Sequence, residues 1–231
     1  MAASEWTSSI PAVGNQISSD IPYIEKNFEE LKEILDDVTD GTVGTTDTAS
    51  FAITSLGKRN IWIGSNDMWG RTTSGPAASQ GEFSTNKLNR KILAFDSSVE
   101  EYAQTLLVMP EGWDRGTIKA KIYWGPASGA SQGDTVEWEI SGLAMGDDDD
   151  MASASYGTSQ VISDTVLAGT NGDLHITSAT PAVTIGGTPA LGDIVSLQIS
   201  RNVSGTDDMT EDAYLYGVML QITIDQSITA W

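Results

Sequence analysis

Carboxylates are the reactive side chains that this sequence has in excess. Its 231 residues include 32 Asp and Glu, one histidine and no cysteine. Disulfides, zinc–thiolate sites and cysteine nucleophiles are therefore excluded. The single histidine, His175, has no G-x-S-x-G serine turn to act with, so we predict an ordinary residue at an outward or turn-proximal position, not a catalytic base. Two carboxylates can hydrolyse a glycosidic bond, but among so many acids the sequence selects no pair.

Calcium is the metal that best suits such a chain, because it takes oxygen ligands alone. The strongest candidate is a run of four aspartates, Asp147, Asp148, Asp149 and Asp150. A second acidic cluster comprises Asp207, Asp208, Glu211 and Asp212. Neither has the D-x-D-x-D-G spacing of a calcium loop, and adjacent side chains of an extended chain point apart. We predict no cofactor and no metal site, with a solvated acidic loop as the main interpretation and weak calcium binding as the alternative.

The formal net charge of −20, from 12 Lys and Arg against 32 Asp and Glu, restricts the partners. Proteins bind phosphate backbones by neutralising them with Lys and Arg, so we expect no nucleic-acid partner. No stretch approaches the ~18 apolar residues of a membrane span, and no secretion signal opens the chain, so we expect no membrane insertion. Neither nucleotide-binding glycine motif is present. We therefore predict that the protein is not an enzyme.

Five tryptophans, Trp62, Trp69, Trp113, Trp124 and Trp138, lie in or beside predicted strands. Core and subunit packing is the main interpretation of these residues. Trp69 and Trp113 lie beside glycines in turn-like sequence, so we predict that these two are exposed and available for surface binding.

The first 50 residues differ in pattern from the rest. Up to residue 20 the apolar residues are isolated, and we predict an extended peptide that either frays or docks on another protein through Trp6, Ile10, Pro11 and Ile17. From residue 20 to 40, apolar residues recur at helical spacing. This stripe packs either on its own domain or in a parallel bundle of copies, in which the oligomerising residues are Ile24, Phe28, Leu31, Ile34 and Leu35. A polar linker, residues 42–50, ends this part.

From residue 51 to 231 the period changes to two, which predicts strands. The predicted strands are residues 60–63, 90–95, 103–109, 117–124, 135–145, 160–167, 173–177, 193–202 and 212–224. One-sided alternation is typical of antiparallel strands with one wet face. In 212–224, Tyr214, Tyr216, Val218 and Leu220 are expected to share a face. We predict a mainly β fold, an antiparallel jelly-roll-like sandwich preceded by an extended peptide and one short α-helix.

Two stretches resemble phage and prophage structural proteins. The N-terminal W-T-S-S-I-P of residues 6–11, the I-P of 21–22 and the N-F-E-E-L of 27–31 resemble the start of fibre and virion-associated chains. The M-P-E-G-W of 109–113, the T-I-K-A-K-I-Y-W of 117–124 and the D-A-Y-L-Y-G-V of 212–218 resemble a phage β-domain. The resemblance implies a virion-located homotrimer, a fibre or head-decoration protein attached by its N-terminus to capsid, portal or tail proteins.

We therefore expect a non-enzymatic structural component of a tailed phage, with the β-domain displayed for host attachment through weak contacts from several tethered copies. Two alternatives stay open. One is a module that binds, or an enzyme that degrades, a host-surface glycan. The other is a capsid cement protein.

Overall fold

The computed structural model describes residues 26, 28, 29, 57–167 and 172–224. The chain divides into two compact units, Met1–Thr54 and Ser55–Trp231. In the first unit, Lys26, Phe28 and Glu29 are helical, and Phe28 is 66% exposed. The rest of the predicted helix and all four predicted anchoring residues lie outside the described residues. No helix of the described residues is long and apolar enough to cross a membrane.

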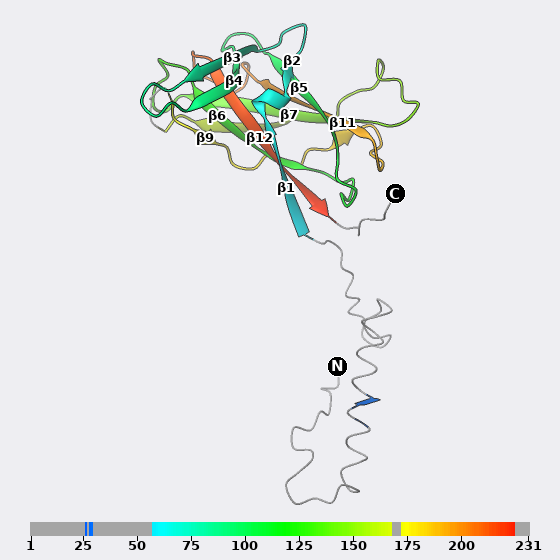
Figure 1. The fold of residues 1–231 in the computed structure, drawn as a ribbon. Coiled ribbons are helices and arrows are strands. Elements are labelled where there is room, and N and C mark those ends of the chain that lie inside the picture. The colour runs from blue at the N-terminus through cyan, green and yellow to red at the C-terminus, as the bar shows by residue number, and fades with distance from the viewer. Residues whose placement is uncertain (1–25, 27, 30–56, 168–171, 225–231) are drawn as a thin grey trace, which may run out of the picture. The chain divides into compact units, whose positions relative to one another are not determined.

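The β-domain forms two six-stranded sheets, which face each other as a sandwich (Figure 1). Sheet A comprises β1 (Gly57–Gly64), β3 (Ala77–Glu82), β4 (Asn89–Phe95), β6 (Lys119–Pro126), β9 (His175–Ile176) and β12 (Ala213–Ile224). Sheet B comprises β2 (Trp69–Gly70), β5 (Tyr102–Val108), β7 (Thr135–Met145), β8 (Gln160–Thr165), β10 (Ile185–Gly186) and β11 (Ile194–Arg201). A 3-10 turn, η1 (Ser65–Asp67), follows β1.

The strand order confirms the predicted fold class. Sheet A runs β3-β4-β12-β6-β9, with β1 paired to β12 beyond the end of β4. Sheet B runs β10-β7-β11-β5-β2, with β8 paired to β7. Successive strands β4, β5, β6 and β7 alternate between the sheets, as in a jelly roll. The strand pairings within the described residues are antiparallel except the short one between β10 and β7. Each predicted strand overlaps an observed one, with ends that differ by up to three residues; β2, β3 and β10 were not predicted.

The core lies between the sheets and follows the predicted alternation. Alternate residues of β6 (Ala120, Ile122, Trp124) and of β11 (Val195, Leu197, Ile199) are buried. At its centre the Trp138 ring meets the rings of Phe95 and Trp124 edge-on, with centroids 5.1 and 6.3 Å away. The Trp124 indole donates to Asp164 Oδ2 at 2.8 Å, so a buried ring finds a partner for its N–H.

A buried ion pair joins the end of β11 to the loop that precedes β12. Arg201 and Asp207 bond through both carboxylate oxygens, at 2.7 and 2.8 Å, and both side chains are almost completely buried. The remaining guanidinium N–H groups donate to the carbonyls of Phe95, Met209 and Glu211. The loop of residues 202–212 is therefore closed around a cation whose donors all have acceptors.

Candidate functional site

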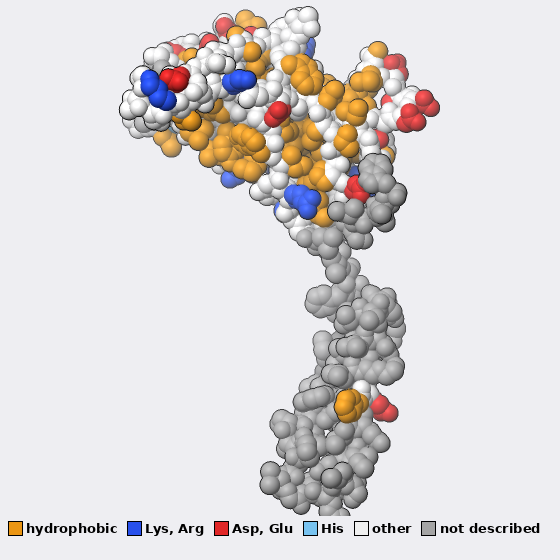
Figure 2. Space-filling model, viewed as in Figure 1, with side chains coloured by type: hydrophobic (Ala, Val, Ile, Leu, Met, Phe, Trp, Pro, Cys, Tyr) orange, Lys and Arg blue, Asp and Glu red, His pale blue; other side chains and the backbone are white. Residues whose placement is uncertain are grey.

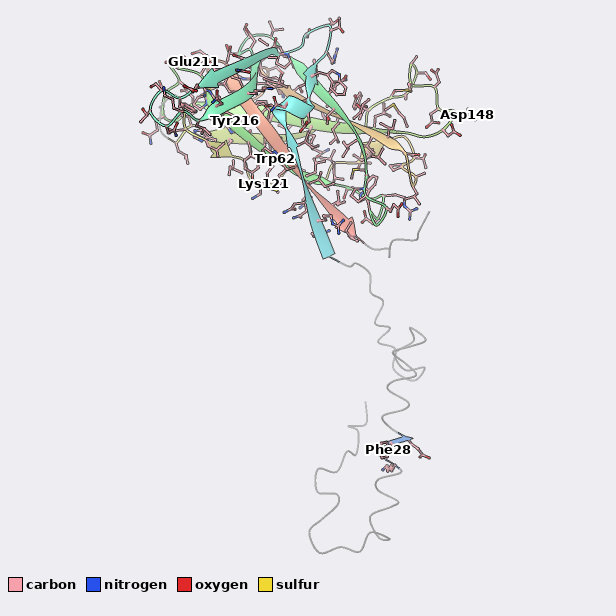
Figure 3. The ribbon with its side chains drawn as sticks, viewed as in Figure 1. Phe28, Trp62, Lys121, Asp148, Glu211 and Tyr216 are labelled. Atoms are coloured by element: carbon pink, nitrogen blue, oxygen red, sulfur yellow. The ribbon has the colours of Figure 1, made fainter. Side chains whose placement is uncertain are left out.

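The outer face of sheet A carries several aromatic rings that are exposed or half-buried. Cross-strand register places Trp62 of β1 opposite Met219 of β12, and Met219 opposite Lys121 of β6. One row further along the strands, Tyr123 lies opposite Gly217. Figure 3 labels Trp62, Lys121 and Tyr216 over the same stretch of β12, and Figure 2 shows hydrophobic side chains gathered there in the same view.

A β-bulge in β12 brings two tyrosines to this face. The register against β6 shifts between Leu215 and Gly217, so that Tyr216 is an extra residue. Leu215 before the bulge and Val218 after it both face the core. The predicted common face of Tyr214, Tyr216, Val218 and Leu220 is therefore wrong. A bulge of this kind re-aims side chains relative to strict alternation.

The indole of Trp62 packs against the backbone of Gly217. A Cβ on Gly217 would lie 2.5 Å from Trp62 Cζ2 and 2.6 Å from the Ile63 carbonyl oxygen, so only glycine leaves space for the indole. The Tyr123 ring meets it edge-on, with centroids 4.9 Å apart and planes at 87°. Trp62 is nevertheless 51% exposed. One part of the ring is held by the sheet while the rest is free to meet a ligand.

Arg90 fixes the neighbouring rings. Its Nη1 donates to the Tyr216 hydroxyl at 3.0 Å, and its guanidinium lies over the rings of Phe83 and Tyr214, at 4.6 and 5.2 Å from their centroids. A guanidinium over aromatic faces is held by the ring quadrupoles as well as by its hydrogen bond. These rings are therefore positioned before any ligand arrives.

Together these residues line an open hollow of about 400 Å³, which we call the aromatic hollow. Its lining is Trp62, Phe83, Leu88, Asn89, Arg90, Lys91, Tyr123, Gly172, Leu174 and Tyr216. A second hollow of about 200 Å³, the lysine hollow, shares Tyr123 with it. Its other lining residues are Asn60, Lys119, Ala120, Lys121, Ala179, Met219 and Gln221. Apolar lining with a few placed polar groups is typical of small-ligand sites.

The outer face of sheet B holds a different hollow, of about 260 Å³ and mostly polar. Its lining includes Glu100, Tyr102, Glu139, Tyr156 and Gln198. Beside it, Gln104 donates to Tyr156 and Gln198, and the Tyr156 hydroxyl bonds Ser196 Oγ at 2.6 Å. Burial and a hydrogen bond to Glu100 raise the pKa of Tyr102. Several polar side chains at this hollow therefore already bond to one another.

Of the predicted surface tryptophans, one is exposed and one is not. Trp69 is 49% exposed on β2, opposite Gln104 on the outer face of sheet B. Trp113 is only 3% exposed and pairs with Ile224 in an isolated bridge, so its predicted exposure is wrong. The flanking glycine signals a turn, but that turn folds the ring into the core. The sequence did not predict the exposure of Trp62, because its position in a strand suggested core packing. The glycine that leaves space for its indole, Gly217, lies 155 residues away in the chain.

The single histidine is also placed differently from its prediction. His175 is 5% exposed and stacks on Trp124, with ring centroids 4.8 Å apart. It belongs to the core side of β9, so its predicted outward or turn-proximal position is wrong. A residue enclosed in this way cannot act as a base on an external substrate.

The acidic run forms an exposed loop, and Figure 3 places Asp148 at its tip. Two of its carboxylates bond to the loop's own amides: Asp149 accepts from Gly146 N at 2.7 Å and Asp150 from Ala152 N at 3.0 Å. The hydrogen bond from the Ser153 side chain, as the largest cause, and that from Ala152 N lower the pKa of Asp150. Across the described ranges, no three His, Cys, Asp or Glu converge as a metal site.

Comparisons with known proteins give fold likenesses only. No family model matches the chain, and no curated protein matches it. Among solved structures, the family 11 carbohydrate-binding module of Clostridium thermocellum, in complex with a mixed-linked tetrasaccharide, is 13% identical, with 72% of this chain and 96% of that chain covered and a TM-score of 0.37. A carbohydrate-binding module of family 28, specific for non-crystalline cellulose, is 8% identical, with 70% and 89% covered and a TM-score of 0.38.

A third likeness is to the CBM22-1–GH10 modules of a Clostridium thermocellum endo-1,4-β-D-xylanase complexed with xylohexaose. Identity is 14%, the TM-score is 0.40, and the match covers 71% of this chain and 27% of that chain. At such low TM-scores and identities, these likenesses carry no conclusion about what this chain binds.

Proposed function

We propose that this protein binds glycans through the outer face of sheet A. The observation that supports it is the seat of Trp62, a half-exposed indole held over Gly217 and against Tyr123. A sugar ring presents a face of C–H groups and a rim of hydroxyls. The C–H face packs on an exposed indole, and the hydroxyls need polar groups beside it. These polar groups are supplied by the residues that line the two adjoining hollows, namely Asn89, Asn60 and Gln221.

The same lining favours binding over cleavage. Glycoside hydrolysis generally needs two carboxylates placed on either side of the bond. Among the described residues, neither the aromatic hollow nor the lysine hollow is lined by an Asp or a Glu. At this face the chain therefore holds a glycan without an acid–base pair to break it.

The test compares two tryptophans of nearly equal exposure on opposite sheets. The full chain, Trp62→Ala and Trp69→Ala are applied to an array of immobilised oligosaccharides, and hits are titrated by calorimetry. A stacked ring is a binding hot spot, so Trp62→Ala should weaken binding about 30-fold, the equivalent of ~2 kcal/mol. Trp69→Ala should bind as the parent does. No hit on the array would refute the proposal, and dependence on Trp69 alone would move the site to sheet B.

Attachment to a phage particle stays a prediction. The anchoring residues and most of the oligomerising residues lie outside the described residues. None of the three solved structures named above is a phage protein. One measurement therefore tests the three predictions of a virion-located homotrimer, a fibre and a capsid cement protein. Cryo-electron microscopy of the particle would show whether residues 1–40 enter a capsid, portal or tail protein.

A further inference from the structure

The strands of sheet A contain mostly cationic charged residues and those of sheet B mostly acidic ones, although the net charge of the chain is negative. The strands of sheet A contain six cationic residues, Lys58, Arg59, Arg90, Lys91, Lys119 and Lys121, and one acid, Glu82. The strands of sheet B contain one cation, the buried Arg201, and three acids, Glu137, Glu139 and Asp164. Glu82 is already paired with Lys87 at 3.4 Å. Lys58, Arg90, Lys119 and Lys121 lie on the same side of the sheet as Trp62, whereas Arg59 and Lys91 alternate with them, so on a chain of net charge −20 this face carries a local excess of cations.

Two of these cations lie where a bound glycan would pass. Lys119 and Lys121 are exposed and point to the same side of β6, two residues apart, hence about 7 Å from each other along the strand. Lys121 is two strands from Trp62, about 10 Å across the sheet. Tyr123 lines both hollows and connects the rings to the ammonium groups.

Neither lysine is paired within the part of the chain that the structure describes. No hydrogen bond or salt bridge joins Lys119 or Lys121 to the described acids, whereas Lys58 on the same face donates to Thr223. Their neighbours across the strands are the uncharged Gln221 and Met219. Gln221 Nε2 donates to Asn60 Oδ1 at 3.4 Å, which leaves the Asn60 amide N–H groups free for a ligand. The lysine hollow therefore offers several donors and no negative charge.

We propose that the glycan taken by this face is anionic, with its carboxylate or sulfate groups held by Lys119 and Lys121 while a neighbouring sugar ring packs on Trp62. This rests on the proposed function of the aromatic hollow and names the class of glycan it takes. The overall negative charge does not oppose it at close range, because the Debye length is about 8 Å at physiological salt. Acidic side chains such as Asp148 gather on a loop apart from Trp62 and Lys121 (Figures 2 and 3).

The test uses matched pairs of polymers that differ only in charge. Alginate, polygalacturonate and hyaluronan are compared with their carboxyl-reduced forms, and chondroitin sulfate and carrageenan with their desulfated forms, by affinity electrophoresis of the full chain. We expect at least one acidic polymer to bind, and its neutralised form to bind about tenfold more weakly. The acidic member that binds distinguishes carboxylate from sulfate.

Variants then assign the effect to the lysines. An exposed ion pair contributes up to about a fivefold change in affinity, so Lys119→Gln/Lys121→Gln should weaken binding of the acidic polymer about tenfold and leave the neutral form within twofold. Arg59→Gln/Arg115→Gln changes the net charge equally but lies outside the lysine hollow, and it should bind as the parent does. Urea unfolding verifies that both double variants fold.

The outcomes separate the two proposals. Binding of the neutral form as tight as that of the acidic form, with loss in Trp62→Ala, would overturn the anionic glycan and keep glycan binding. Absence of binding to every polymer and to the array would overturn both. Tighter binding of a single-stranded oligodeoxythymidylate, lost in both Trp62→Ala and the lysine double variant, would identify nucleic acid as the occupant and also overturn both.

Discussion

Asp207→Asn should be among the most damaging single substitutions in the β-domain. It removes one charge and almost no volume from a carboxylate that is nearly completely buried. Arg201 then stays charged and buried, with its fork facing an amide that accepts on one side only. Breaking a buried ion pair by removing one partner costs about 3–5 kcal/mol. The carboxylate also accepts from Glu137 N at 3.1 Å, so β7 loses a partner too.

The assay is urea unfolding followed by tryptophan fluorescence, because Trp138 lies opposite Arg201 in the register of β7 and β11. We expect an unchanged m-value, a free energy of unfolding lower by about 3–5 kcal/mol, and a Tm lower by about 6–20 °C. Asp148→Asn is the matched control, since its side chain is exposed, and it should leave stability within ~0.5 kcal/mol. A loss below ~1 kcal/mol for Asp207→Asn would refute the reasoning.

A double variant separates the contribution of the ion pair to stability from that of the hydrogen bonds between Arg201 and backbone carbonyls. Replacing both partners of a buried pair by apolar residues is often close to neutral, because no charge is left behind. Here Arg201→Met/Asp207→Leu also leaves the carbonyls of Phe95, Met209 and Glu211 without their donor. Each unsatisfied buried acceptor costs about 1–3 kcal/mol, so we expect the double variant to stay destabilised by at least ~3 kcal/mol. Recovery to parental stability would show that these carbonyls find water instead.

Two further predictions concern the site and the pH dependence. Gly217→Ala should destabilise the domain by about 1–3 kcal/mol and displace Trp62, because the new Cβ meets backbone as well as the ring; urea unfolding and glycan titration measure both effects. Burial raises the pKa of Glu101 above its ordinary value of 4.5, so its contribution to stability is fully present below pH 4.5 and is lost as the pH rises through the raised pKa. Unfolding free energies measured from pH 4.5 to 7 should therefore fall less steeply in Glu101→Gln than in the parent, and an identical slope would contradict this.

Local alternation predicted most of the sandwich because burial of one face leaves a signal within each strand. In β6 the buried and exposed sets were both predicted, since Lys119 and Lys121 alternate with apolar residues in sequence. Strands β2, β3 and β10 gave no such signal. Two of them are two residues long, and β3 reads A-A-S-Q-G-E, whose small and polar residues pair at an edge without burying a side chain.

The site was harder to predict because its residues are non-local. The bulge at Tyr216 inverts the alternation of β12 halfway along, and nothing in the residue types marks the inversion. The placement of Trp62 depends on Gly217, and that of Trp69 on pairing with the first half of β5. Trp113 shows the converse, since its local sequence is typical of an exposed turn, while in the fold it is buried and forms a backbone bridge with Ile224, which is distant in sequence.

The bulge and the charge division act on the same strand, and this links the fold to the proposed ligand. Before the bulge, β12 pairs with β4, which contributes Arg90; after it, β12 pairs with β1, which contributes Trp62. The opposite edge pairs with β6 throughout and contributes Tyr123 and Lys121. One strand therefore collects rings and cations from three segments that are distant in sequence. The net charge of −20 describes the whole chain but not the face proposed to bind a glycan, because the charge of each face has to be counted separately before it indicates a partner.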